Sequence, residues 1–250
     1  MDFSEIAILL LVLVVVFLCV HLMHNKWPYT KRREHNDVAG FVFAGIGVMY
    51  GVLLAFVVIA ASDSLNSGRN ITYNEANQLA NVYWLSRGLP QPQQAAIQGL
   101  AVNYAHTVVD TEWPLMAKDE SSAQAQLLLD QMRDDVLGFT PRSLQQQVIY
   151  EEALTSVNDL SAARRDRLVA MRETIPEPVW IVLIIGGLIT VGFCFLFGLQ
   201  NRIVHASMVA SLAVLVTISL ILIKNMQYPF AGDPHIGPDA FEIFLSQVRP

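Results

Sequence analysis

The sequence predicts an all-α membrane protein in which four transmembrane helices form two hairpins, with a soluble helical bundle inserted between them. Apolar residues make up 53% of the 250 residues and charged residues only 15%, which is too apolar for a typical soluble domain. The apolar residues gather in four long stretches, and the sequence becomes polar between the second and third. We therefore expect a first transmembrane hairpin at 1–61, a soluble helical domain at 62–178, a second hairpin at 179–225 and an irregular C-terminal tail at 226–250.

The four apolar stretches are long enough to cross a bilayer. A hydrocarbon core of about 30 Å needs about 20 apolar residues in a helix, because backbone groups there find no water to bond. None of the stretches contains Asp, Glu, Lys or Arg, and they run approximately over Ile6–Met23, Val38–Ala61, Val179–Gly198 and Ile203–Ile223. The alternative is a soluble protein that buries these helices in its core.

Basic residues in the first short loop predict the orientation of the spans. Lys and Arg in short loops favour the cytoplasmic side, and this loop contains Lys26, Lys31, Arg32 and Arg33. We therefore expect a multi-pass protein of the bacterial inner membrane with its soluble domain outside the cytoplasm. A second basic group before the third stretch favours the opposite orientation, although long loops translocate largely regardless of charge; it comprises Arg164, Arg165, Arg167 and Arg172.

The inserted segment has the composition of a helical bundle. Gln, Asn, Ala and Ser are abundant and clusters of β-branched residues are rare, which favours helices over strands. Gly and Pro residues divide the segment into four expected helices, which end near Arg87, run from Pro92 to near Trp113, cover Ser121–Leu137 and cover Ser143–Thr174.

The second apolar stretch contains the candidate functional residues of the membrane region. Gly47, Gly51 and Ala55 are four residues apart, a spacing that lets helices pack closely in lipid. The alternative is that this helix lines a pore, in which Phe41, Phe43 or Phe56 forms an apolar constriction that gates by dewetting. These six residues are therefore candidates for helix packing or for pore lining.

Four charged residues near the ends of the stretches are candidates for the mouths of a pore. In an oligomer single charges repeat as rings that act on passing ions, although such residues are more often solvated anchors at the membrane surface. The four are Asp63, Glu177, Lys224 and Asp233. The middle of each stretch has no charge, which argues against a proton relay.

Signatures of catalysis and of cofactor binding are missing from the sequence. We find no phosphate-binding loop, no zinc-protease motif, no nucleophile elbow and no cysteine pair at metal spacing, so we expect no catalytic residue, metal or cofactor. The formal net charge of -6 argues against a nucleic-acid partner. The partners we expect are the lipid bilayer, further copies of this chain as a homo-oligomer, and small inorganic ions.

Several short motifs resemble a bacterial membrane family described as bestrophin-like. They are spread over most of the chain and comprise Gly40-Phe41-Val42-Phe43, Gly47 through Ala55, Glu75-Ala76-Asn77-Gln78-Leu79, Leu89-Pro90, Tyr104, Glu112-Trp113-Pro114, Arg167-Leu168, Ile175-Pro176, Trp180 and Pro229-Phe230-Ala231-Gly232. The resemblance implies a relation to bestrophins, which are pentameric anion channels with helical cytoplasmic domains. The chain departs from true bestrophins in three features: no residues match the aromatic neck or the acidic calcium clasp, and the basic loop predicts the helical domain on the opposite side of the membrane.

Two functions are consistent with the sequence. The first is an oligomeric, bestrophin-like anion channel in which the second span lines the pore or packs around it. The alternative is a non-conducting membrane protein that senses the envelope or binds a partner through its helical domain. A lipid or small-solute transporter is a third hypothesis, which the scarcity of Gly- or Pro-interrupted spans disfavours.

Overall fold

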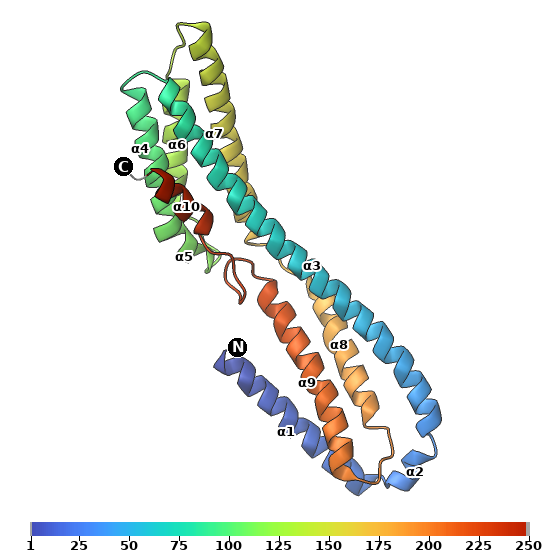
Figure 1. Ribbon diagram of the computed structural model, residues 1–250. Helices are drawn as coiled ribbons and strands as arrows, with labels where there is room; N and C mark the ends of the chain where they lie inside the picture. The colour runs from blue at the N-terminus through green and yellow to red at the C-terminus, as the bar shows by residue number, and fades with distance from the viewer. Residues whose placement is uncertain (1, 249–250) are drawn as a thin grey trace. The chain divides into compact units, whose positions relative to one another are not determined.

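The computed structural model describes residues 2–248, and within that range the chain is helical and contains no strand. A 3₁₀ turn at Ser86–Gly88 follows α3, and a π-helical turn at Val108–Glu112 separates α4 from α5. The all-α class predicted from the sequence is confirmed. The α-helices, labelled in Figure 1, are α1 (Phe3–Lys26), α2 (Tyr29–Arg33), α3 (Asn36–Leu85), α4 (Gln93–Thr107), α5 (Trp113–Met116), α6 (Ala123–Leu137), α7 (Leu144–Ala170), α8 (Glu177–Cys194), α9 (Arg202–Met226) and α10 (Asp239–Val248).

Four helices, α1, α3, α8 and α9, are long and apolar enough to cross a membrane. Each one contains or closely overlaps one of the four apolar stretches, so the structure has four candidate spans where the sequence predicts them. The α3 helix has 50 residues, far more than a bilayer requires, and its second half is polar. It continues past Ala61 because Ser and Asn are tolerated in a helix, and no proline interrupts it before Leu85.

The chain divides into two compact units. The first, here called the membrane unit, comprises the chain through residue 62 together with 174–227, and the second, the polar unit, comprises 63–173 together with the chain from 228 onward. Both units thus contain part of α3. The chain from residue 228 onward, expected as an irregular tail, belongs to the polar unit, where turns and bends up to residue 238 lead into α10.

In the membrane unit, α9 packs between α1 and α8 (Figure 1). The contact with α1 is close because three of the buried residues of α9 are alanines, a pattern that favours helix approach in lipid; the residues are Val16 and Val20 with Ala206, Val209, Ala210 and Ala213. The neighbour of α1 in this unit is therefore α9, although α3 is the next long helix in sequence. A second cluster joins Val57 of α3 to Leu183 of α8 and Ile223 of α9.

In the polar unit, α4, α6, α7, α10 and the second half of α3 share one apolar core. Ser122 and Ser143 begin α6 and α7 as N-caps, accepting hydrogen bonds from the backbone N–H groups of Ala125 and Gln146, as short polar side chains do at helix starts. The α10 helix contributes an apolar face with side chains at three- and four-residue spacing, formed by Phe241, Phe244 and Leu245.

Candidate functional site

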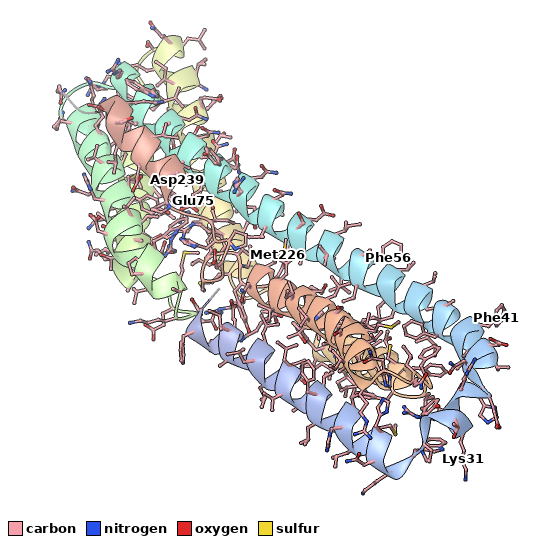
Figure 2. All side chains as sticks on the ribbon, turned by 60° about the horizontal axis from the view of Figure 1, so that its bottom comes forward. Lys31, Phe41, Phe56, Glu75, Met226 and Asp239 are labelled. Carbon is pink, nitrogen blue, oxygen red and sulfur yellow. The ribbon has the colours of Figure 1, made fainter. Side chains whose placement is uncertain are left out.

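One face of α3 is exposed along the whole apolar half of the helix. Its residues are three, four or seven apart, so they form a single stripe, and Phe41 and Phe56 are 85% and 67% exposed. Figure 2 shows both side chains on the side of α3 that points away from α8 and α9. We call this stripe the open face of α3; it comprises Phe41, Val48, Val52, Phe56 and Ile59.

The same stripe continues into the polar half of α3 with a different chemistry. Residues at the next positions of the stripe are exposed and polar, and they comprise Asp63, Asn66, Asn70 and Asn77. The open face therefore changes from apolar to polar within four residues, between Ile59 and Asp63. An uninterrupted helix carries both halves.

The opposite face of α3 is packed within the membrane unit. Phe43 stacks on Phe193 with ring centroids 6.3 Å apart and meets Phe197 edge-on at 5.8 Å. Tyr50 donates a hydrogen bond of 3.1 Å from its hydroxyl to the carbonyl oxygen of Leu183. Of the three candidate aromatic residues, Phe41 and Phe56 thus lie on the open face, and Phe43 lies against α8.

Two glycines in the apolar half of α3 have no close neighbour among the described residues. A methyl group built on Gly47 or Gly51 would meet no atom within 4 Å, and Gly51 and Ala55 are exposed. These residues run along the side of α3 that separates the open face from the packed face, here called the shoulder, and at about 100° of rotation per residue Gly47 lies nearest to the packed face. Closely packed glycines occur instead on α8, where a Cβ on Gly186 or Gly187 would lie 2.8 Å from Tyr50.

The four candidate mouth charges are all exposed, but they lie in different parts of the chain. Asp63 is on the open face of α3. Glu177 is in the first turn of α8 and Lys224 in the last turn of α9, where each charge complements the helix dipole. Asp233 lies in the segment before α10. In the described part of the membrane unit, no ion pair joins Glu177 to Lys224.

Buried charges form a network inside the polar unit, with Glu75 on the inner side of α3 (Figure 2). Arg167 donates to Glu75 from Nε at 2.5 Å and from Nη2 at 2.9 Å, and to Glu112 at 2.7 Å. Arg164 donates to Glu112 at 2.6 Å. The hydroxyl of Tyr104 donates to Glu75 at 2.6 Å. We call these five residues the buried network; two carboxylates balance two guanidinium groups.

The network favours the charged forms of Arg167 and Glu112 and the neutral form of Tyr104. Burial alone would lower the pKa of Arg167, yet the carboxylates of Glu75 and Glu112 raise it. Burial alone would raise the pKa of Glu112, but the guanidinium groups of Arg167 and Arg164 lower this pKa below its ordinary value. The pKa of Tyr104 lies well above its ordinary value because the hydroxyl is buried and next to Glu75, so the group stays neutral and donates its proton.

The sequence contained a signal for this network that composition alone does not reveal. Glu75 stands between Ile71 and Leu79 at four-residue spacing, on the face of α3 that enters the core, and all three side chains are partly or fully buried. A charged residue in an apolar stripe indicates a buried partner. Glu112 is turned into the core by the π-helical turn that contains it, and such turns cannot be inferred from the sequence pattern.

Comparisons with known proteins agree with the fold. The family model described as Bestrophin-like domain matches residues 10–241. A membrane-protein crystal structure is similar with a TM-score of 0.69 and 11% identity, over 96% of each chain. Two single-substitution variants of a bacterial bestrophin homologue from Klebsiella pneumoniae are also similar. The first has a TM-score of 0.68 at 11% identity and covers 96% of this chain and 98% of its own. The second has a TM-score of 0.66 at 13% identity and covers 99% of this chain and 97% of its own. No curated protein matches the chain.

Proposed function

The chain belongs to the bestrophin-like family, and we propose that it is an oligomeric ion channel that conducts small inorganic anions along an axis lined by the open face of α3. The chain shares its fold with a bacterial bestrophin homologue. The observation that carries the proposal is the change in the open face from phenylalanine and valine to aspartate and asparagine on one uninterrupted helix.

That change matches what a conduction path needs. An apolar constriction excludes water when it is narrow and admits ions when it widens, and Phe41, Val48, Val52 and Phe56 supply such side chains. The amides of Asn66, Asn70 and Asn77 can replace part of the hydration shell of an ion. In the proposed channel the first half of α3 forms the gate and the second half lines a wet vestibule.

The shoulder of the open face supports a shared axis. In a ring of subunits, a helix that faces the axis contacts its neighbours with the surfaces beside that face. Gly47, Gly51 and Ala55 lie on such a surface, and a methyl group on either glycine would meet no described atom within 4 Å. Small residues at this spacing favour helix approach in lipid. We propose that they contact the neighbouring subunit in a homo-oligomer.

The charged residues take different roles in this proposal. Asp63 follows the apolar part of the open face, so in the oligomer it forms an acidic ring at one mouth of the gate. Such a ring attracts cations and opposes anions, and it therefore limits the preference for anions that the family resemblance implies. Glu177, Lys224 and Asp233 are proposed as further charges at the mouths.

We propose an inner-membrane location with the loop containing α2 in the cytoplasm and the polar unit outside it. Short-loop Lys and Arg residues support this orientation. Arg164 and Arg167, which favour the opposite one, are neutralised by buried carboxylates in the folded polar unit. Labelling of Lys31→Cys from the cytoplasm and of Leu144→Cys from outside tests the orientation, and the reverse pattern would overturn it.

Recordings from the purified oligomer in planar bilayers test the proposed channel. We expect unitary currents, and a polar substitution on the open face, Phe56→Ser, should increase them because it wets the constriction. Phe17→Ser is the matched control: Phe17 is likewise exposed, but on α1, and we expect it to leave the currents unchanged. If an intact oligomer gave no unitary currents, this result would support the non-conducting alternative, an envelope sensor or partner-binding protein.

A further inference from the structure

Arg32 is the largest fully buried side chain of the membrane unit, although it lies in a basic loop between two spans. It is 2% exposed. Its Nη1 group donates to the carbonyl oxygens of Phe195 and Phe197 at 2.9 and 3.1 Å, which are free acceptors at the end of α8. Arg32 thus links α2 to the segment between α8 and α9.

The other two donor groups of Arg32 have no partner. Both Nε and Nη2 are buried and make no hydrogen bond. The acidic residues nearest in sequence, Glu34 and Asp37, are exposed, and no ion pair within the described residues joins either of them to Arg32. A buried guanidinium with two unused donors and no carboxylate is unfavourable, and an oxyanion would satisfy it in the two-pronged geometry that arginine favours.

A pair of histidines lies at the same end of α8 that Arg32 contacts. His205 Nε2 lies 3.0 Å from the carbonyl oxygen of Cys194, and because a carbonyl only accepts, Nε2 carries the proton. Neutral His205 therefore accepts at Nδ1 from His24 Nε2, 3.2 Å away.

An apolar groove adjoins the same residues. A groove of about 580 Å³ between α3, α8 and α9 is lined by Phe197 and His205. Phe197 is one of the two residues whose carbonyl oxygens accept hydrogen bonds from Arg32. The other walls of the groove are apolar and belong to segments within the membrane unit, and they include Phe43, Met208, Leu212 and Leu215. Basic residues on the adjoining turn, Lys31 and Arg33, are exposed, as expected at the level of lipid headgroups.

We propose that the two free donors of Arg32 bind the phosphate group of an anionic phospholipid whose acyl chain lies in the groove. The guanidinium supplies the recognition of an oxyanion, and the groove supplies the recognition of a hydrocarbon chain. A free phosphate ion would use only the first of these. The site is separate from the open face of α3, and lipid binding does not depend on conduction.

Native mass spectrometry of the intact protein tests the site. The protein is titrated with phosphatidylglycerol and, separately, with diacylglycerol of the same acyl chains, which lacks the phosphate group. We expect phosphatidylglycerol to bind about tenfold more tightly, the size of one charge-assisted hydrogen-bonding group. Arg32→Gln should remove this preference. Arg33→Gln, which removes the same charge from the exposed neighbour, should keep it, and equal losses in the two variants would overturn the proposal.

Two further measurements separate a lipid from a free anion and remain informative if Arg32→Gln fails to fold. Met208→Trp fills the groove from an exposed position without touching Arg32, and it should weaken phosphatidylglycerol binding. Inorganic phosphate at millimolar concentration should leave the bound lipid in place. Complete displacement by inorganic phosphate, or lipid binding by Met208→Trp equal to that of the unmodified protein, would overturn the lipid assignment.

Discussion

Removing Arg167 should destabilise the polar unit strongly, because its guanidinium serves two buried carboxylates at once. Arg167→Met leaves Glu75 and Glu112 with Arg164 as the remaining cation of the buried network, so one negative charge is uncompensated in the core. Removing one partner of a buried ion pair costs about 3–5 kcal/mol. The loss here should lie in the upper part of that range, because Arg167 makes three hydrogen bonds to the carboxylates.

A double substitution distinguishes the charge effect from a packing effect. Arg167→Met combined with Glu75→Leu restores neutrality and leaves the pair of Arg164 and Glu112 intact. Residues that share a buried network couple by about 0.5–3 kcal/mol, so the double variant should be more stable than Arg167→Met alone. If packing dominated, the two substitutions would add.

Denaturant unfolding of the full chain in detergent, followed by tryptophan fluorescence, measures both variants. Trp113 is a local reporter because the Arg167 guanidinium lies 5.2 Å from its ring. Arg172→Met is the control: it breaks an exposed pair with Asp119 at 3.3 Å, and exposed pairs contribute less than about 1 kcal/mol. A loss for Arg167→Met no larger than that of Arg172→Met would refute the reasoning.

Three further predictions concern selectivity, assembly and pH. Asp63→Asn should raise the permeability of anions relative to cations severalfold in reversal-potential measurements, because it removes the proposed acidic ring; an unchanged ratio would place Asp63 off the conduction path. Gly51→Leu should break the oligomer in size-exclusion chromatography while each subunit stays folded. Gly187→Leu should instead impair folding, because the new side chain would meet Tyr50. An intact Gly51→Leu oligomer would argue against a subunit contact at Gly51. The pKa of Glu112 is lowered in the folded state, so its contribution to stability is present above the ordinary pKa of glutamate and is lost as pH falls through the lowered value; thermal unfolding of Glu112→Gln should show a weaker loss of stability in acid than the unmodified protein.

The spans could be predicted from the sequence because they depend on a property summed over about 20 residues. A single residue such as His205 does not change that sum. Their partners in the membrane unit could not be predicted, because every face of an apolar helix is compatible with lipid. The contact of α1 with α9 depends on the shape of surfaces that include Ala206 and Ala210, and a pattern of small residues on one helix does not specify the opposing helix.

The buried network shows why charged residues were harder to interpret. In the sequence, Arg164 and Arg167 were interpreted as positive charges near a span, and Arg167 also as part of a motif that resembles the family. In the structure they lie in the core, because Glu75 from α3 and Glu112 from a π-helical turn reach the same point from distant parts of the chain. Arg32 was likewise interpreted only as a signal of orientation, whereas the loop after α8 buries it. Such pairings depend on tertiary structure and leave little trace in local sequence.

Imaging of the particle in lipid nanodiscs, at a resolution that separates helices, tests the central claim most directly. We predict a ring of subunits in which Phe41 and Phe56 of every α3 face a common axis and Gly47 and Gly51 face the adjacent subunit. A monomer, or an oligomer in which the open face of α3 contacts lipid, would contradict the proposed conduction path.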